Sequence, residues 1–195
     1  MLRLGLTGSI ATGKSTILKA FADLGVPVFS SDDAVHALYE EEAVPLVEKA
    51  FPGVTRDGAI DRVALSQKLL AAPERLKDLE AIVHPLVRAR MAAFLDSARE
   101  SGAKLAVVDI PLLYETGFDY GLDKVAVTWC DPALQRERAL RRPAMTVEKL
   151  EAILARQMPQ DEKKRRADYL FDTGRPIAAV REEVGKLVAQ LNAEP

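Results

Sequence analysis

The sequence contains little cysteine, little net charge and no long hydrophobic run, and each shortage excludes a class of protein. Cys130 is the only cysteine, so neither a disulfide within the chain nor a zinc site of thiolates can form. We expect Cys130 to be a buried thiol and the protein to be cytoplasmic, since a reducing compartment suits such a chain. No stretch reaches the roughly 18 apolar residues of a membrane-spanning helix, and residues 1–7 lack a signal-peptide core. We therefore expect no membrane partner.

The charges of the chain nearly balance. Its 27 Lys and Arg residues oppose 29 Asp and Glu residues, which gives a formal net charge of −2. This balance lacks the basic excess of proteins that bind nucleic acid non-specifically, so we expect no nucleic-acid partner. A basic run at 163–166 follows Asp161 and Glu162, and we interpret it as a solvated helix end. An anionic ligand must therefore be bound at a local site.

The hydrophobic pattern predicts alternating strands and helices. Of the 195 residues, 48% are hydrophobic, which is ordinary for a globular chain, and the length favours one domain with an insertion over two domains. Short apolar runs alternate with segments whose apolar residues recur three and four apart, a pattern typical of a parallel sheet flanked by helices. The predicted fold class is α/β, with five strands at 2–6, 26–29, 105–108, 124–129 and 169–171.

The long interval between the second and third predicted strands needs structure of its own. Apolar residues at helical spacing predict one amphipathic helix over 73–98. Pro85 lies inside this pattern and cannot donate a backbone hydrogen bond, so we expect the helix to kink or break near His84. The remaining predictions are helices at 33–42 and 61–70, and turns at 52–53 and 56–58. The insertion is therefore predicted to be helical.

The first predicted strand leads into a glycine-rich loop and then a helix. Residues Gly8–Ser15 match the Gly-x-x-x-x-Gly-Lys-Ser/Thr pattern of phosphate-binding loops. Glycines permit close approach and a helix N-terminus carries positive partial charge, so backbone N–H groups here can bind phosphate oxygens. Lys14 would reach the β- and γ-phosphates of a nucleotide such as ATP, and Ser15 would offer a hydroxyl ligand to Mg²⁺. A chance match is a poor alternative, since a random chain matches about once in a hundred. The predicted ligand-binding residues are Gly8, Ala11, Thr12, Gly13, Lys14, Ser15 and Thr16.

Carboxylates follow two of the other predicted strands. Ligands of open parallel sheets bind beyond the carboxyl ends of strands, so Asp32 could accept a proton from an attacking hydroxyl. Capping of the following helix, by Ser31 or Asp32, is an equal alternative. Asp109 ends the third strand, where a carboxylate can hold Mg²⁺ directly or through water. For Asp109, too, capping of the next helix is the alternative.

A cluster of arginines follows the fourth predicted strand. Arg138 and Arg142 are spaced to share one face of a helix, where two planar cations could grip a triphosphate. The alternative is a solvated helix face, but the arginines lead toward Pro143 and not into a ladder of acidic partners, which favours function. The cluster comprises Gln135, Arg136, Arg138, Arg141 and Arg142. We expect residues 141–164 to close over bound nucleotide as a lid.

These motifs together resemble the dephospho-CoA kinase family. The phosphate loop alone is shared by a superfamily, whereas His84-Pro85 and the Pro-Leu-Leu-Tyr-Glu run at 111–115 look specific to this family. The matching segments, in chain order, are 6–16, Leu24-Gly25, Asp32, 57–62, 79–85, 109–115, Gln135 with Arg138 and Arg142, Arg156-Gln157, and Ala167-Asp168. The resemblance covers nearly the whole chain.

The resemblance implies a fold, a reaction and partners. The implied fold is a P-loop NTPase core of three layers, αβα, at 1–30, 103–140 and 165–195, with a helical insertion at 31–102 that binds dephospho-CoA and a short lid at 141–164. The implied reaction transfers the γ-phosphoryl group of ATP, with Mg²⁺, to the ribose 3′-hydroxyl of dephospho-CoA, the last step of coenzyme A synthesis. The expected partners are ATP and dephospho-CoA, and the default oligomeric state is a monomer.

The resemblance also implies roles for single residues. Asp32 matches the last carboxylate of the family's Asp-Ala-Asp element and would be the catalytic base. Arg62 and His84 would lie near the acceptor, and the triphosphate and Mg²⁺ would be served by Lys14, Ser15, Arg138 and Arg142. The chain departs from the family pattern at Ser30–Ser31, which replace Asp-Ala, and at 172–174, where Asn usually precedes Ser-Gly. The second departure affects the adenine side.

Two other functions compete with this interpretation. One is a P-loop kinase for another small alcohol, such as a nucleoside, a nucleotide or a sugar-like acceptor, which would use the same loop and base. The other is a GTP-binding switch. The chain contains neither Asn-Lys-x-Asp nor Thr-Lys-x-Asp, the guanine-binding signatures, so the switch is disfavoured.

Overall fold

The chain folds into two units, which we call the sheet unit and the helical unit. A computed structural model describes residues 1–193. The sheet unit holds Met1–Phe29 and the described residues from Ser97 onward, and the helical unit holds Ser30–Asp96. The segment predicted to be a lid, 141–164, lies within the sheet unit.

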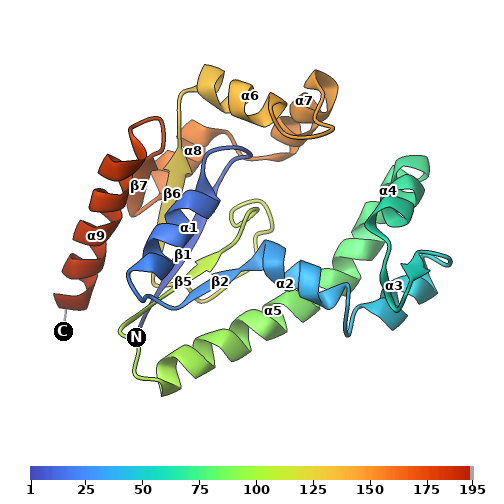
Figure 1. Cartoon of the computed structure of the whole chain (residues 1–195), viewed down its shortest axis with the longest axis horizontal. Helices are drawn as coiled ribbons and strands as arrows, with labels where there is room; N and C mark the ends of the chain where they lie inside the picture. Colours follow the sequence, from blue (N-terminus) through green and yellow to red (C-terminus); the bar gives the residue numbers. More distant parts are fainter. Residues whose placement is uncertain (194–195) are drawn as a thin grey trace. The chain divides into compact units, whose positions relative to one another are not determined.

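A five-stranded sheet forms the centre of the sheet unit (Figure 1). The strand order is β2-β5-β1-β6-β7, with β1 paired in parallel to both β5 and β6, and β6 paired in parallel to β7. The strands are β1 (Leu2–Gly8), β2 (Val28–Ser30), β5 (Leu105–Asp109), β6 (Lys124–Trp129) and β7 (Tyr169–Asp172). The predicted α/β class and parallel sheet are confirmed. Parallel pairing brings the carboxyl ends of the strands to one edge, where ligands of such sheets bind.

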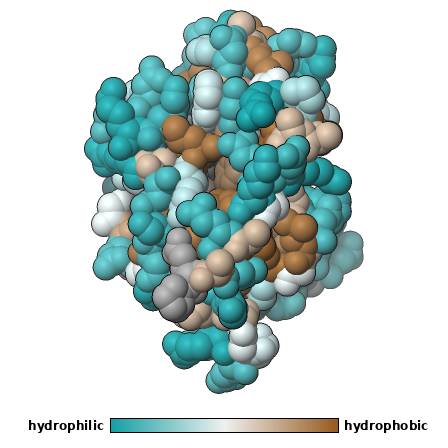
Figure 2. Space-filling view, turned by 90° about the vertical axis from the view of Figure 1, so that its left-hand side faces the viewer, coloured by the Kyte–Doolittle hydropathy of each residue, from teal (hydrophilic) through white to brown (hydrophobic). Residues whose placement is uncertain are grey.

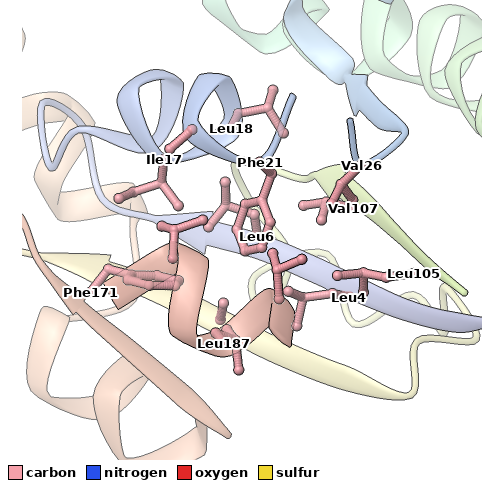
Figure 3. Close-up of a cluster of buried hydrophobic side chains, with 14 of the residues drawn as sticks. Leu4, Leu6, Ile17, Leu18, Phe21, Val26, Leu105, Val107, Phe171 and Leu187 are labelled. Atoms are coloured by element: carbon pink, nitrogen blue, oxygen red, sulfur yellow. The ribbon is translucent and has the colours of Figure 1, made fainter. Parts of the chain in front are cut away.

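Two helices cover one face of this sheet, α1 (Lys14–Asp23) and α9 (Ile177–Ala193). Leu4 and Leu6 of β1 share a buried core with Phe21 of α1 and Leu187 of α9 (Figure 3). On the opposite side of β1, Leu122 packs closely over Gly5, where an added Cβ would lie 2.5 Å from Leu122 Cδ1 and would displace that side chain. Three further helices complete the unit, α6 (Pro132–Leu140), α7 (Val147–Arg156) and α8 (Gln160–Arg166); α8 packs against β6, and α6 packs against α7.

The helical unit has a separate hydrophobic core. Phe51, Val47 and Leu38 are fully buried in it. Its elements are α2 (Ser31–Leu38), α3 (Val44–Ala50), the hairpin β3 (Thr55–Arg56) and β4 (Ala59–Ile60), α4 (Arg62–Ala71), the 3-10 turn η1 (Pro73–Arg75) and α5 (Leu76–Glu100). The helix predicted at 33–42 is therefore shorter at its carboxyl end and is followed by turns. The predicted turn at 56–58 joins the hairpin.

Helix α5 continues through Pro85, so of the two predicted alternatives near His84 the break does not occur, and the kink stays a prediction. Proline removes one backbone hydrogen bond and costs about 3 kcal/mol inside a helix. Leu79 and Val83 on the amino-terminal side of Pro85 are buried in the core of the helical unit, and Met91 beyond it is also buried. Burial of large apolar side chains contributes about 1.5–3 kcal/mol each, which offsets the missing bond.

The surface in Figure 2 is mostly hydrophilic, with hydrophobic side chains in separate small groups. Within residues 1–193, no helix has both the length and the apolar character needed to span a membrane. Cys130 is buried as predicted, and burial raises the pKa of its thiol.

Candidate functional site

The phosphate loop, Gly8–Ser15, follows β1 and leads into α1. Gly8 is required by packing, because a Cβ there would lie 2.2 Å from Thr128 Oγ1 on the neighbouring strand. Gly13 has φ 82° and Ala11 has φ 61°, both in the left-handed region that only glycine adopts readily. The loop therefore holds its shape against backbone strain at Ala11, a common property of ligand-binding loops.

The amino terminus of α1 is open to an anionic ligand. Its N-cap is Gly13, which provides no side-chain hydrogen bond, and its first turn contains no acidic residue. The first N–H groups of a helix lack partners within the helix, and together with the positive end of the helix dipole they favour a phosphate. The predicted geometry for phosphate binding is thus present.

Lys14 lies beside the carboxylate at the end of β5. Its Nζ is 3.3 Å from Asp109 Oδ1, and the Asp109 side chain is 5% exposed. The pairing of Leu6 with Asp109 in the β1–β5 register brings the loop and this carboxylate together. The alternative role for Asp109 as a helix cap is wrong, because Asp109 is followed by turns and the next helix, α6, begins at Pro132.

A cavity of about 440 Å³ opens beside the loop. Arg138 and Arg142 line it, as does Arg175, which the sequence analysis did not select. Arg142 lies beyond the end of α6 and reaches the cavity from the turn that follows, in which its N–H donates to Ala139 O. The other lining residues are Ala11, Gly13, Ser15, Thr16, Thr173, Ile177 and Val180. Three guanidinium groups and the open helix terminus make this cavity suited to a polyphosphate.

Thr12 has a different position from its neighbours in the loop. Its side chain is fully buried, and its Oγ1 donates to Ser9 O at 2.7 Å and lies 2.8 Å from Thr128 Oγ1. The Thr12 side chain therefore faces the interior of the loop, and the prediction that the loop binds phosphate through its backbone N–H groups is unaffected. The hydroxyl stabilises the loop from within.

Thr173 connects the loop to Arg138. Its Oγ1 lies 2.9 Å from Thr12 O and 3.2 Å from Trp129 O, and Arg138 donates to Thr173 Oγ1 at 3.1 Å and to Thr173 O at 2.9 Å. Thr173 lies in the segment where the chain departs from the family pattern, and the sequence assigned that departure to the adenine side and no role to the Thr173 hydroxyl. The structure makes it a support of the phosphate site.

Other arginines of the predicted cluster do pair with acids. Arg141 forms an ion pair with Glu137, and Arg136 Nη1 lies 3.6 Å from Glu151 Oε1. The expectation that these arginines lack acidic partners is therefore wrong for Arg136 and Arg141. The basic run at 163–166 also differs from its prediction, because Lys163 is fully buried.

The predicted acceptor residues belong to the helical unit. Ser30, and neither Ser31 nor Asp32, caps α2, since Ser30 Oγ accepts from Asp33 N at 3.1 Å. Asp32 lies in the first turn of α2 and is exposed. Arg62 begins α4 and its Nη1 lies 3.4 Å from His36 Nδ1. His84 lies on α5 and is half-buried.

Oxygen ligands suited to Mg²⁺ are present in the sheet unit. Ser15 supplies a hydroxyl beside the cavity, and Asp109 supplies a buried carboxylate. Among the described residues, no group of three or more His, Cys, Asp or Glu side chains could hold a metal ion. Mg²⁺ usually binds through one or two protein oxygens together with substrate phosphates, so these residues fit a cation that arrives with a nucleotide.

The sheet order, the loop and the arginine-lined cavity define a P-loop kinase of small molecules. Shikimate kinase from Bacteroides thetaiotaomicron shares this fold, with a TM-score of 0.56 at 16% identity over 96% of this chain and 98% of that chain. A family model described as dephospho-CoA kinase matches residues 2–178. The chain belongs to the dephospho-CoA kinase family.

Individual relatives agree with the family match. A dephospho-CoA kinase from Rhodopseudomonas palustris is 53% identical over 188 residues, covering 96% of this chain and 94% of the relative. One from Agrobacterium fabrum is 52% identical over 193 residues, covering 99% and 100%. The solved dephospho-CoA kinase from Campylobacter jejuni has a TM-score of 0.69 at 27% identity, covering 97% of this chain and 96% of that chain.

Proposed function

We propose that this chain transfers the γ-phosphoryl group of ATP to the ribose 3′-hydroxyl of dephospho-CoA, giving coenzyme A and ADP. The observation that carries the proposal is that residues of the phosphate loop and two predicted arginines, Arg138 and Arg142, line one cavity. The chain that contains this cavity belongs to the dephospho-CoA kinase family. We also propose that the enzyme acts as a cytoplasmic monomer.

The sheet unit binds the triphosphate in this proposal. Backbone N–H groups at the start of α1 hold phosphate oxygens, while Lys14 leaves its contact with Asp109 far enough to reach the β- and γ-phosphates. Arg138 and Arg142 lie across the cavity and stabilise the negative charge that is redistributed during transfer. Arg138 is already oriented by two hydrogen bonds to Thr173, so little reorganisation is needed at this residue.

Ser15 and Asp109 would hold Mg²⁺ in this proposal, Asp109 directly or through water. A bound Mg²⁺ neutralises charge on the β- and γ-phosphates. The ion pair with Lys14 holds the buried carboxylate of Asp109 beside the phosphate loop.

The helical unit provides the acceptor residues. Asp32 would accept the proton of the attacking 3′-hydroxyl, since an exposed carboxylate that does not cap its own helix is available for this task. Arg62 and His84 would bind the acceptor, with Arg62 pairing with one of its phosphates. These roles follow the family pattern residue by residue.

A coupled ADP-release assay with Mg-ATP tests the proposal. Dephospho-CoA is compared with adenosine, AMP and shikimate as acceptors, and the product mass is measured. We expect selective turnover of dephospho-CoA with the addition of one phosphate. Turnover of another acceptor alone would retain the kinase chemistry and reject the substrate.

A further inference from the structure

The backbone of Ile10, inside the phosphate loop, is bonded by two glutamines, one at its N–H group and one at its C=O group. Ile10 N donates to Gln157 Oε1 at 2.9 Å, and Gln135 Nε2 donates to Ile10 O at 2.8 Å. Gln135 is 5% exposed. Ile10 directly precedes Ala11, whose φ of 61° is strained for a residue with a side chain. The two glutamines thus fix the loop at the residue before its strained position.

Gln157 is itself held firmly, although it comes from the segment predicted to be a lid. Its neighbour Met158 donates its N–H to Glu115 Oε1 at 2.8 Å. Lys163 Nζ lies 2.8 Å from the same Glu115 oxygen, and the Lys163 side chain is fully buried. Breaking a buried ion pair leaves an uncompensated charge in the interior, so this contact anchors the start of α8 and the linker before it.

A third glutamine closes the network. Gln160 Nε2 donates to Gln135 Oε1 at 2.9 Å, and Gln160 Oε1 accepts from Cys130 N at 3.3 Å. The network therefore joins the phosphate loop to the end of β6 through side chains of α6 and α8. Apolar packing supports the network, since Leu150 of α7 and Ala11 belong to one small buried cluster against which Ile10 packs.

We propose that Gln157 is a positioning residue for the phosphate-binding loop, and that residues 157–163 are a fixed support of that loop. This role deepens the proposed function and rests on it, because the KM values that test it are those for ATP and dephospho-CoA. By holding the Ile10 amide, Gln157 orients the peptide that precedes the phosphate-binding N–H groups. The movable part of the predicted lid then ends before Gln157.

The substitution Gln157→Met tests the proposal, because methionine keeps the length of the side chain and removes the strong acceptor. Gln190→Met on the exposed face of α9 is the matched control. We expect Gln157→Met to weaken the binding of ADP alone by about five- to tenfold, the usual effect of one lost hydrogen bond at a site. The KM for ATP should rise by a similar factor, while the KM for dephospho-CoA should stay within about twofold of the wild type.

Amide hydrogen exchange at Ile10 gives a readout that general destabilisation would not produce. We expect the Ile10 amide to lose protection in Gln157→Met and to keep it in Gln190→Met. Gln157→Glu retains an oxygen acceptor and should keep the Ile10 amide protected. If Gln157→Met does not fold, Gln157→Asn, which is one methylene shorter, serves for the same measurements.

Equal ADP affinity and equal Ile10 protection in Gln157→Met and Gln190→Met would overturn the proposal. Equal rises in the KM values for ATP and dephospho-CoA would also overturn it, since that result indicates a general structural defect. The ADP-binding measurement requires no acceptor. If the wild type binds ADP but does not phosphorylate dephospho-CoA, the proposed function is wrong. The role of Gln157 is still decided in that case, by the ADP affinities of the variants.

Discussion

Three polar residues around the phosphate loop and two proposed acceptor residues of the helical unit differ in burial. In the sheet unit, Thr12, Thr173 and Asp109 are more than nine-tenths buried, and each contacts another element of that unit. In the helical unit, Asp32 and Arg62 are exposed, and the guanidinium of Arg62 contacts His36 and the ring of Tyr39. The buried residues that support the phosphate loop are thus already ordered, whereas Asp32 and Arg62 are exposed side chains that can adapt to a ligand.

This difference indicates how binding energy is used in each unit. A buried, bonded side chain is already ordered, so little entropy is lost when the triphosphate binds. An exposed side chain such as Arg62 loses rotamer freedom when a ligand fixes it. Substitutions in the sheet unit should therefore affect both stability and nucleotide binding, and substitutions of the exposed residues in the helical unit should affect the reaction alone.

The largest effect is expected at Asp32. Asp32→Asn should reduce kcat by roughly 10² to 10⁴, the usual range for loss of a general base, while ATP affinity and the melting temperature stay nearly unchanged. Steady-state kinetics, ATP titration and thermal denaturation measure these three quantities. Near-normal turnover would show that Asp32 is not the base.

Truncation of one buried ring in each unit tests whether the two cores are separate. Phe21→Ala in the sheet unit and Phe51→Ala in the helical unit each remove a fully buried ring, and each should cost about 3–5 kcal/mol of unfolding free energy. Hydrogen exchange should show lost protection mainly in the unit that carries the substitution. Equal loss of hydrogen-exchange protection in both units, for both variants, would contradict the separation of the two cores.

Lys14, the proposed phosphate-binding lysine, is paired with a buried carboxylate of the sheet unit. Lys14→Met should lower kcat/KM for ATP by roughly 10² to 10³, the size expected when a donor to developing charge is removed. It should also destabilise the protein, because Asp109 loses a cation at 3.3 Å. Unchanged kinetics with ATP would reject the assignment of the phosphate loop.

Substitution of Thr173 should also affect both stability and nucleotide binding, but less than substitution of Lys14. Thr173→Val keeps the shape and removes the hydroxyl that contacts Thr12 O, Trp129 O and Arg138. We expect about 1–3 kcal/mol of lost stability from the unsatisfied buried groups, and a several-fold rise in the KM for ATP. Thr173→Ser is the control and should restore both. A stable Thr173→Val variant with an unchanged KM would refute this role.

The smallest expected effect is that of an ion pair at the surface. Arg3 donates two side-chain hydrogen bonds to Asp123, and this pairing lowers the pKa of the Asp123 carboxyl from 3.8. A carboxyl with a lowered folded-state pKa stabilises the protein above its unfolded pKa and loses that contribution as the pH falls through the folded pKa. Asp123→Asn should therefore cost less than about 1 kcal/mol at pH 7.

The pH dependence of that difference is the check. Chemical denaturation of wild type and Asp123→Asn should give unfolding free energies that differ at pH 7 and converge as the pH falls below about 4. A difference that grows as the pH falls would have the wrong sign for this pair.

Local sequence patterns were sufficient to predict the parts of the fold that depend on near neighbours. The β6 strand has the predicted bounds, 124–129, because an apolar run bounded by turns specifies a strand locally. The phosphate loop was equally predictable, since its glycines and the following helix act within one segment. A break near Pro85 does not occur for the opposite reason, because burial on both sides of the proline outweighs the local defect.

The amino-acid sequence by itself determined the α/β class, the phosphate loop and the family, because each is written in short patterns along the chain. The tertiary structure alone decided that Thr173 supports Arg138, that Lys163 is buried beside Glu115, and that Gln157 holds Ile10. These partners are 35, 48 and 147 residues apart in the sequence. No local pattern encodes such a contact; it forms when the sheet brings distant strand ends to one edge and burial requires every polar group there to find a partner.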